Sequence, residues 1–154
     1  MIGDGIDWGK VRIWNKSYGW TFGFQGENVI SPNGKDIFYG DSYRDDMVGD
    51  MGEMARLVHE LVHVWQGQNG IEISLSNRGK YDYTTYLRRG VGWSGMKIEA
   101  QAELVTDLYL KLNNYRQQYG LPVGYSPAFL RSMIPFSVPA YDNKQPTNPW
   151  RGWP

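Results

Sequence analysis

The fold and the chemistry of this chain are decided by the stretch Arg56–Gln66, RLVHELVHVWQ, which contains the pattern His-Glu-x-x-His. The chain has only two histidines, His59 and His63, and both lie in this stretch. On an α-helix, side chains four positions apart lie on one face, with their Cβ atoms about 5–6 Å apart. Two imidazoles with this spacing can bind one metal ion, and Glu60 between them can reach a water bound to that metal. The pattern predicts a zinc-dependent peptidase.

A helix is predicted around this motif. The segment Asp50–Glu53 has the form of a capping box, with a carboxylate at the N-cap position and Glu at N3. After it, apolar residues recur at helical spacing: Met54, Leu57, Val58, Leu61, Val62 and Trp65. Gly67 and Gly70 are expected to end the helix. Because the histidines lie beside the apolar stripe, we expect a largely buried helix whose metal-binding face is turned to a cleft.

Length and composition indicate a globular domain of the α+β class. The 154 residues suffice for a core, and 41% hydrophobic and 21% charged residues exclude a disordered chain. No apolar run approaches the roughly 20 residues that cross a bilayer. Sixteen basic and sixteen acidic side chains balance, so no overall field favours nucleic acid or anionic lipid. We predict a metallopeptidase domain over residues 1–142 and a Pro- and Trp-containing C-terminal tail over residues 143–154.

The N-terminal residues have neither the basic region nor the apolar region of a Sec-type signal peptide. We therefore expect the protein to stay in the cytoplasm or to leave it by a route that needs no such peptide. Cysteine is absent, so thiolate metal ligands are excluded.

The N-terminal third predicts a small β-sheet. The segment Ser31–Gly34, SPNG, is a strong turn signal, and the strand after it completes a predicted hairpin. Alternating or β-branched runs predict short strands at residues 10–14, 20–24, 28–30, 36–39 and 71–75.

A second helix is predicted from about Met96 to Asn113, with an acidic stripe of one carboxylate per turn at Glu99, Glu103 and Asp107. Between the helices, residues 76–95 are predicted to form a long loop rich in Gly, Tyr and Arg. A long connection inside a compact domain is usually functional or mobile. After residue 120 the chain is rich in Pro and is predicted to be irregular.

The third metal ligand must be a carboxylate, because the chain has no third His and no Cys. Glu72 and Asp82 each stand alone, whereas a helix holds a ligand rigidly and its next carboxylate can orient an imidazole. Two registers of the acidic stripe fit this role. Either Glu99 is the ligand with Glu103 behind it, or Glu103 is the ligand with Asp107 behind it, and spacing does not separate them.

Residues 57–66 together with Ile98–Asp107, IEAQAELVTD, resemble the gluzincin type of zinc peptidase. More narrowly, they resemble the small metallopeptidase domains encoded beside, or fused to, type VI secretion spike (Vgr-related) proteins and Rhs toxins. The turn SPNG before an Ile-Phe-Tyr strand also resembles those proteins, and the resemblance covers about residues 5–112. It implies a zincin-like fold, with a small N-terminal sheet, an active-site helix and a second helix that carries a Glu ligand.

The wider clan carries Glu-x-x-x-Asp on its second helix, and the Glu is the ligand. Placed on Glu99 and Glu103, this resemblance implies that His59, His63 and Glu99 bind Zn²⁺, with Glu103 in place of the usual Asp. Glu60 would then be the general base that activates water. We expect the donor that stabilises the carbonyl oxyanion to be a Tyr or Arg of the predicted loop at residues 76–95, which contains Tyr81, Tyr83, Tyr86, Arg88 and Arg89.

Two functions follow from the resemblance. The first is an active zinc endopeptidase, an antibacterial toxin made in the bacterial cytoplasm and secreted by the type VI system into the periplasm of a target cell. Its partners would be a protein substrate, a spike protein and an immunity protein. The second is a catalytically silent zinc-binding cargo or adaptor module of the spike. The intact Glu60 favours the first, since a structural zinc site needs no base between its ligands.

Overall fold

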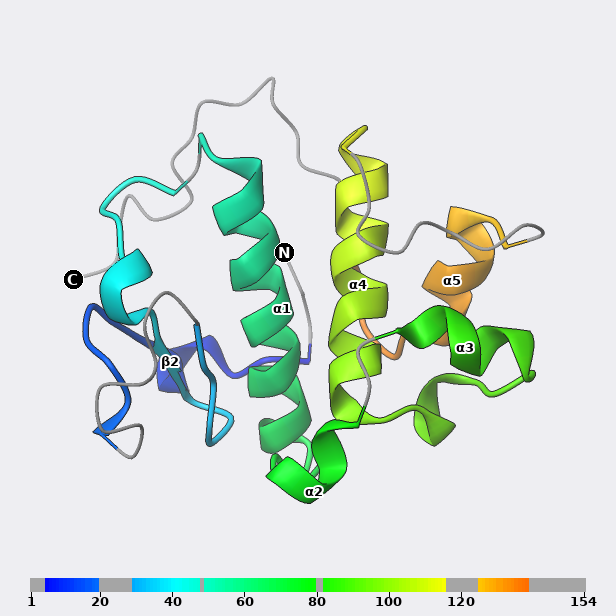
Figure 1. Cartoon of the computed structure of the whole chain (residues 1–154), viewed down its shortest axis with the longest axis horizontal. Coiled ribbons are helices and arrows are strands. Elements are labelled where there is room, and N and C mark those ends of the chain that lie inside the picture. The colour runs from blue at the N-terminus through cyan, green and yellow to red at the C-terminus, as the bar shows by residue number, and fades with distance from the viewer. Residues whose placement is uncertain (1–4, 20–28, 48, 80–81, 116–124, 139–154) are drawn as a thin grey trace.

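The computed structural model describes residues 5–19, 29–47, 49–79, 82–115 and 125–138. This part of the chain forms an α+β fold with five α-helices and one two-stranded parallel sheet (Figure 1). Two long helices, α1 (Met51–Gln68) and α4 (Ile98–Leu112), lie side by side at its centre. The sheet lies against α1, and three shorter helices lie around α4 (Figure 1).

Helix α1 confirms the helix predicted around the histidine motif. The Asp50 side chain accepts hydrogen bonds from the backbone N–H groups of Gly52, at 2.8 Å, and Glu53, at 3.2 Å. These bonds satisfy two of the donors that a helix N-terminus leaves unpaired. The helix ends at Gln68, and Gly70 follows it with a φ of 78°.

The core lies between α1 and α4, which pack against each other along their length. Fully buried apolar side chains of both helices belong to this core: Val62, Val64, Ala100, Ala102, Leu104, Val105 and Leu108. At one end, the rings of Trp65, Trp93 and Phe136 contact one another at centroid separations of 4.9–6.0 Å. This packing fixes α4 relative to α1 and so fixes their polar side chains relative to each other.

In the described residues, the predicted N-terminal sheet has two strands. Strand β1 (Arg12–Trp14) pairs in parallel with β2 (Asp36–Phe38), with Ile13 opposite Ile37. Ile30 and Phe38 exchange two backbone hydrogen bonds in an isolated antiparallel bridge, so only one pair of the predicted hairpin forms. The predicted strand at residues 20–24 lies outside the described residues, as does the tail at residues 143–154.

Two predictions between α1 and α4 were wrong. Residues 71–74 form no strand, because their backbone is bonded locally: the Ile71 N–H donates to Gln66, and the Asn77 side chain donates to the carbonyl of Glu72. Residues 76–95 are not one loop. They contain α3 (Tyr83–Arg88), the end of α2 (Leu75–Arg78) and the 3₁₀ turn Trp93–Gly95.

Helix α3 forms because Asp82 caps it through the Thr84 N–H, and because Tyr83 and Leu87, four positions apart, are both buried. The chain after residue 120 was predicted to be irregular, yet it forms α5 (Pro127–Met133), which packs on α4. The Ser126 side chain caps α5 by accepting from the Phe129 N–H.

Two further 3₁₀ turns, Trp8–Lys10 and Gly40–Ser42, complete the described elements. In the described part of the chain, no helix has the length and hydropathy that crossing a bilayer requires.

Candidate metal site

Three side-chain atoms lie close together, one from each histidine of α1 and one from the first glutamate of α4. His59 Nε2 and His63 Nε2 lie 3.2 Å apart, and Glu99 Oε2 lies 3.2 Å from each of them. The three atoms form an equilateral triangle at the interface of the two helices. Glu99 and His63 are only 3% and 5% exposed, so little water reaches the triangle from their side.

A chain of buried amides sets the proton position on His63. Gln66 Nε2 donates to the carbonyl of Ile98 and to Gln101 Oε1, so Gln66 Oε1 faces His63 Nδ1, at 2.7 Å. Gln101 is oriented in turn, because its Nε2 donates to the carbonyl of Trp93. Since Gln66 Oε1 can only accept, the proton of a neutral His63 is on Nδ1, and Nε2 points its lone pair into the triangle.

Glu103 has the corresponding role for His59. Its Oε1 lies 3.4 Å from His59 Nδ1, on the side of the ring away from the triangle. Of the two registers of the acidic stripe, only Glu99 brings an oxygen to both Nε2 atoms. Asp107, the next carboxylate of the stripe, accepts a hydrogen bond from the Tyr83 hydroxyl at 2.9 Å.

The electrostatics of the triangle favour a positive charge. Burial alone would lower the pKa of His59, but Glu103 and Glu99 outweigh it and raise the pKa to about 10. Burial would raise the pKa of Glu99, but the two imidazoles outweigh it and hold that pKa far below its usual range. A divalent metal ion bound by these atoms would supply such a charge.

The residues present fit a divalent metal. A tetrahedral zinc with bonds of about 2.0–2.1 Å holds its ligand atoms about 3.3 Å apart, close to the edges of the triangle. Both imidazoles have a hydrogen-bond acceptor on the far nitrogen, as metal-binding histidines do. One ligand atom each of His59, Glu60 and His63 also lie within 4.8 Å of one another. Glu99 Oε2 lies 3.2 Å from both Nε2 atoms, which is well inside that limit, so Glu99 can also complete the set of donors.

Glu60 lies between the two histidines on α1, and its carboxylate is buried. Its carboxylate accepts a hydrogen bond from the backbone N–H of Ser31, and burial raises its pKa. Its Oε2 is buried and, like Oε2 of Glu103, has no hydrogen-bond partner among the residues that the structure describes. A buried carboxylate oxygen without a donor is costly unless a ligand or a water supplies one. A carboxylate with a raised pKa and one oxygen that receives no donor in the described residues is able to accept a proton.

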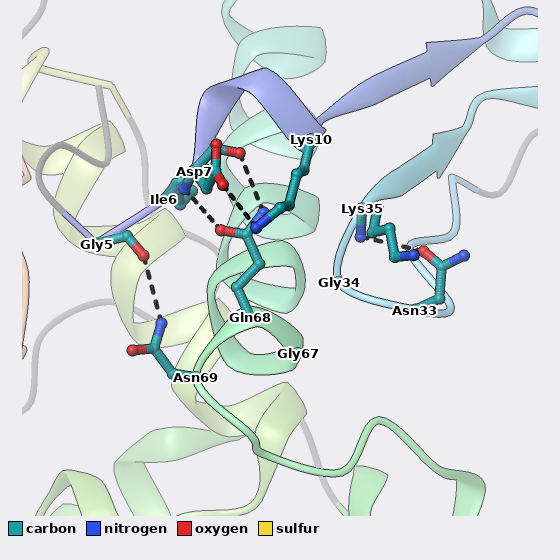
Figure 2. Close-up of a pocket in the computed structure, with 10 residues that line it drawn as sticks. All are labelled: Gly5, Ile6, Asp7, Lys10, Asn33, Gly34, Lys35, Gly67, Gln68 and Asn69. Carbon is teal, nitrogen blue, oxygen red and sulfur yellow. Dashed lines mark hydrogen bonds and ion pairs between the residues drawn. The ribbon is translucent and has the colours of Figure 1, made fainter.

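The turn that holds Ser31 is fixed by close contact with the end of α1. A Cβ built on Gly34 would come within 2.8 Å of the backbone of Gly67, and Gly34 has a φ of 69°. Beside this contact lies a cavity of about 650 Å³, lined by the residues drawn in Figure 2.

The polar side chains around this cavity bond within its wall. Gln68 pairs with the backbone of Asp7, and the Asn69 amide donates to the carbonyl of Gly5 (Figure 2). None of the triangle residues lines the cavity.

The predicted oxyanion donor Tyr83 is engaged in a different hydrogen bond. Tyr83 is fully buried, and its hydroxyl proton is engaged by Asp107, while Tyr81 lies outside the described residues. Asp82 caps α3, and Glu72 is exposed. Instead, Arg78 at the end of α2 places its Nε 3.4 Å from Glu99 Oε1.

Sequence reasoning missed Gln66, Gln101 and Arg78. Gln66 carried a signal, because it lies three residues after His63 and therefore on the same helix face. Arg78 lies in the loop where a donor was expected, although it was not named there.

These features define a class of site: an α+β domain whose two central helices bring together imidazoles and carboxylates that could hold a metal ion. No protein-family model matches the chain. The type VI secretion system spike protein VgrG2b of Pseudomonas aeruginosa is 30% identical over 129 residues, which are 75% of this chain and 12% of that protein. The solved structure of the effector domain of Pseudomonas aeruginosa VgrG2b matches with a TM-score of 0.52 and 28% identity, over 71% of this chain and 65% of that one.

Both comparisons find VgrG2b, and the solved structure is that of its effector domain. This chain is therefore homologous to the effector domain of VgrG2b. The matched region is a small part of the whole spike protein, 12% of its length.

Proposed function

We propose that this chain is a zinc-dependent peptidase domain that acts as a type VI secretion effector. One observation supports the peptidase part of this proposal: His59 Nε2, His63 Nε2 and Glu99 Oε2 form a triangle with edges of 3.2 Å. Near it lies a Glu60 oxygen that has no hydrogen-bond partner among the described residues. We assign His59, His63 and Glu99 as the zinc ligands, Glu60 as the general base and Glu103 as the partner that orients His59.

Each residue has a defined task in peptide hydrolysis. A bound zinc supplies Lewis acidity, which polarises a carbonyl and lowers the pKa of water to about 7. Glu60 accepts a proton from the attacking water, whose oxygen forms a bond to the carbonyl carbon, and returns that proton to the nitrogen as the C–N bond breaks. Ser31 holds one oxygen of Glu60 through its N–H, which leaves Oε2 for the water. Gln66 and Glu103 keep the imidazoles in the tautomers that bind metal.

The proposed role as a type VI secretion effector is based on homology. The related domain belongs to a type VI secretion spike protein, and its solved structure is described as an effector domain. We propose that this chain is likewise delivered by that system into the periplasm of a target cell. There it would cleave a protein substrate, and an immunity protein would protect the producing cell. The zincin-like fold is part of the same proposal.

The test compares zinc content and casein digestion of wild type, Glu60→Gln and His59→Ala. Wild type should bind one zinc and cleave casein. The Glu60→Gln protein should bind zinc equally well but cleave about 10²–10⁴-fold more slowly, because only the base is removed. Full proteolysis by His59→Ala would refute the site assignment. If wild type and Glu60→Gln bind zinc alike and neither cleaves, the chain is a silent cargo or adaptor module.

The compartment in which the protein acts is tested separately, by expression in a bacterial host with and without an added periplasmic signal peptide. Periplasmic wild type should stop growth, while periplasmic Glu60→Gln and cytoplasmic wild type should not. Equal toxicity of the wild-type protein in both compartments would refute a periplasmic target.

A further inference from the structure

Arg78 lies beside the triangle, on the second oxygen of its carboxylate. Glu99 Oε2 faces the two imidazoles, and Glu99 Oε1 lies 3.4 Å from Arg78 Nε. The two partners differ in exposure: the Glu99 side chain is 4% exposed and the Arg78 side chain is 39% exposed. Arg78 therefore reaches from solvent to the edge of the buried site.

The local fold holds Arg78 in this position. Arg78 ends α2, and the next residue, Gly79, has a φ of 69°. A Cβ on Gly79 would lie 2.6 Å from Lys97 Cβ, so the chain passes closely over the start of α4. Asn77 links the same region by donating to the carbonyl of Glu72 and accepting from Lys97 Nζ. These contacts place α2 against the first turn of α4, where Glu99 lies.

Most of the hydrogen-bonding capacity of Arg78 is unused. A guanidinium has five N–H donors in a planar fork. In the described part of the chain, the contact of its Nε with Glu99 is the one interaction found for this side chain, and its terminal nitrogens meet no protein acceptor. A half-exposed cation with free donors next to a candidate metal site is suited to bind an oxygen of a ligand there.

The acidic side chains of the site indicate what the Arg78 guanidinium could do there. Three carboxylates, those of Glu60, Glu99 and Glu103, lie around the two imidazoles of the site. When a peptide carbonyl is attacked, its oxygen gains a further negative charge that needs a preorganised donor. Among the residues that the structure describes, Arg78 is the one Lys or Arg that is ion-paired with any of these three carboxylates.

We propose that Arg78 donates to the carbonyl oxygen of the scissile peptide bond and stabilises the oxyanion. The inference rests on the proposed peptidase function. Water oxygen bonds to the carbonyl carbon, the π electron pair moves to the carbonyl oxygen beside Arg78, and Glu60 holds the proton released by the water. When the carbonyl re-forms, the C–N bond breaks and the nitrogen takes the proton from Glu60.

The test measures zinc affinity, kcat and KM for Arg78→Met and Arg78→Lys. Loss of an oxyanion donor should lower the kcat of Arg78→Met by about 10²–10³-fold with little change in KM. Its zinc affinity should stay equal or increase, because a positive charge beside the metal has been removed. Arg78→Lys keeps the charge without the fork and should lose less activity.

The matched control is Arg56→Met. Arg56 pairs with buried Glu53 at the same distance, 3.4 Å, with a 48% exposed side chain, but it contacts none of the triangle atoms in the described chain. Arg56→Met should keep wild-type kcat and zinc affinity.

Binding of an N-phosphoryl dipeptide, a tetrahedral anion, provides a readout besides turnover. Calorimetry on zinc-loaded protein should show that Arg78→Met binds this probe at least about tenfold more weakly, whereas Arg56→Met binds it normally.

The outcomes separate the two proposals. If Arg78→Met loses zinc affinity and regains full activity at saturating zinc, Arg78 only positions Glu99 and the inference is overturned. If wild type cleaves and Arg78→Met cleaves equally, the inference fails and the peptidase function stands. If zinc-loaded wild type cleaves no peptide, both fail.

Discussion

At the scale of single residues, Gln66 links the candidate ligand His63 to the backbone of the other central helix. Its amide is completely buried, and it bonds to His63 Nδ1, to the carbonyl of Ile98 and to Gln101. One side chain thus sets the tautomer of an imidazole on α1 and tethers it to α4. Residues that orient a metal-binding histidine typically contribute about 10–100-fold to metal affinity.

Gln66→Leu tests this role. Leucine fills similar volume but leaves His63 Nδ1 and Gln101 Oε1 without their hydrogen-bond partner in the core. We expect zinc affinity to fall about 10–100-fold and the free energy of unfolding to fall by about 1–3 kcal/mol. Competition with a fluorescent chelator measures the first and urea unfolding the second. The control is Gln68→Leu, which removes hydrogen bonds to Asp7 at the same end of α1 and should leave zinc affinity unchanged. Equal zinc affinities in both variants would contradict the role of Gln66.

At the scale of elements, the turn Ser31–Gly34 connects the small sheet to the candidate base. Gly34 touches the backbone of Gly67 at the end of α1, and Ser31 donates its N–H to the carboxylate of Glu60. The side chain of Asn33 shapes the turn by accepting from the N–H groups of Lys35 and Asp36. The contact of two glycines thus determines where the Ser31 N–H lies.

Gly34→Ala and Gly70→Ala form a matched pair, since both glycines have positive φ, 69° and 78°. A Cβ on Gly70 meets no atom within 4 Å, whereas a Cβ on Gly34 meets Gly67 at 2.8 Å. Gly70→Ala should cost about 1–2 kcal/mol of unfolding free energy from its backbone conformation alone. Gly34→Ala should cost at least about 2 kcal/mol more and should lower kcat, because the turn must move away from Glu60. Equal unfolding free energies of the two variants by urea titration would show that the contact is unimportant.

At the scale of the whole molecule, the candidate metal site lies across the main packing interface. Glu60, Glu99, Glu103 and Asp107 are all buried where α1 and α4 meet or beside it. Such charges destabilise the fold unless they are paired or bound to a cation. A metal that bridges His59 and His63 on α1 to Glu99 on α4 would therefore act as a clamp between the two helices.

Removal of zinc should lower thermal stability. Binding to the folded state alone stabilises by about 4 kcal/mol when free zinc exceeds its Kd a thousandfold. For a domain of this size that corresponds to a rise in Tm of about 8–16 °C. Scanning calorimetry with zinc and with EDTA measures the difference. The His59→Ala protein should show a much smaller shift, and an equal shift would place the zinc elsewhere.

Much of the local structure was predictable because its causes are local. The capping Asp50, the apolar stripe and the two histidines four positions apart act within α1, and the helix predicted at 96–113 was confirmed as α4. The turn SPNG was recognised from its residues, although its contact with Gly67 was not. Helices α3 and α5 were missed, because they are short and are stabilised by burial against α4 rather than by their own periodicity.

The sequence by itself determined that the two histidines share a helix face and that any third metal ligand must be a carboxylate, since composition offers nothing else. It left two registers of the acidic stripe open. Only the packing of α4 on α1 decided that an oxygen of Glu99 lies 3.2 Å from both Nε2 atoms while Glu103 faces Nδ1 of His59. The partners Gln66, Ser31 and Arg78 were likewise decided by tertiary structure. Helical spacing specifies angles within one helix, whereas distances between elements depend on packing that no local pattern encodes.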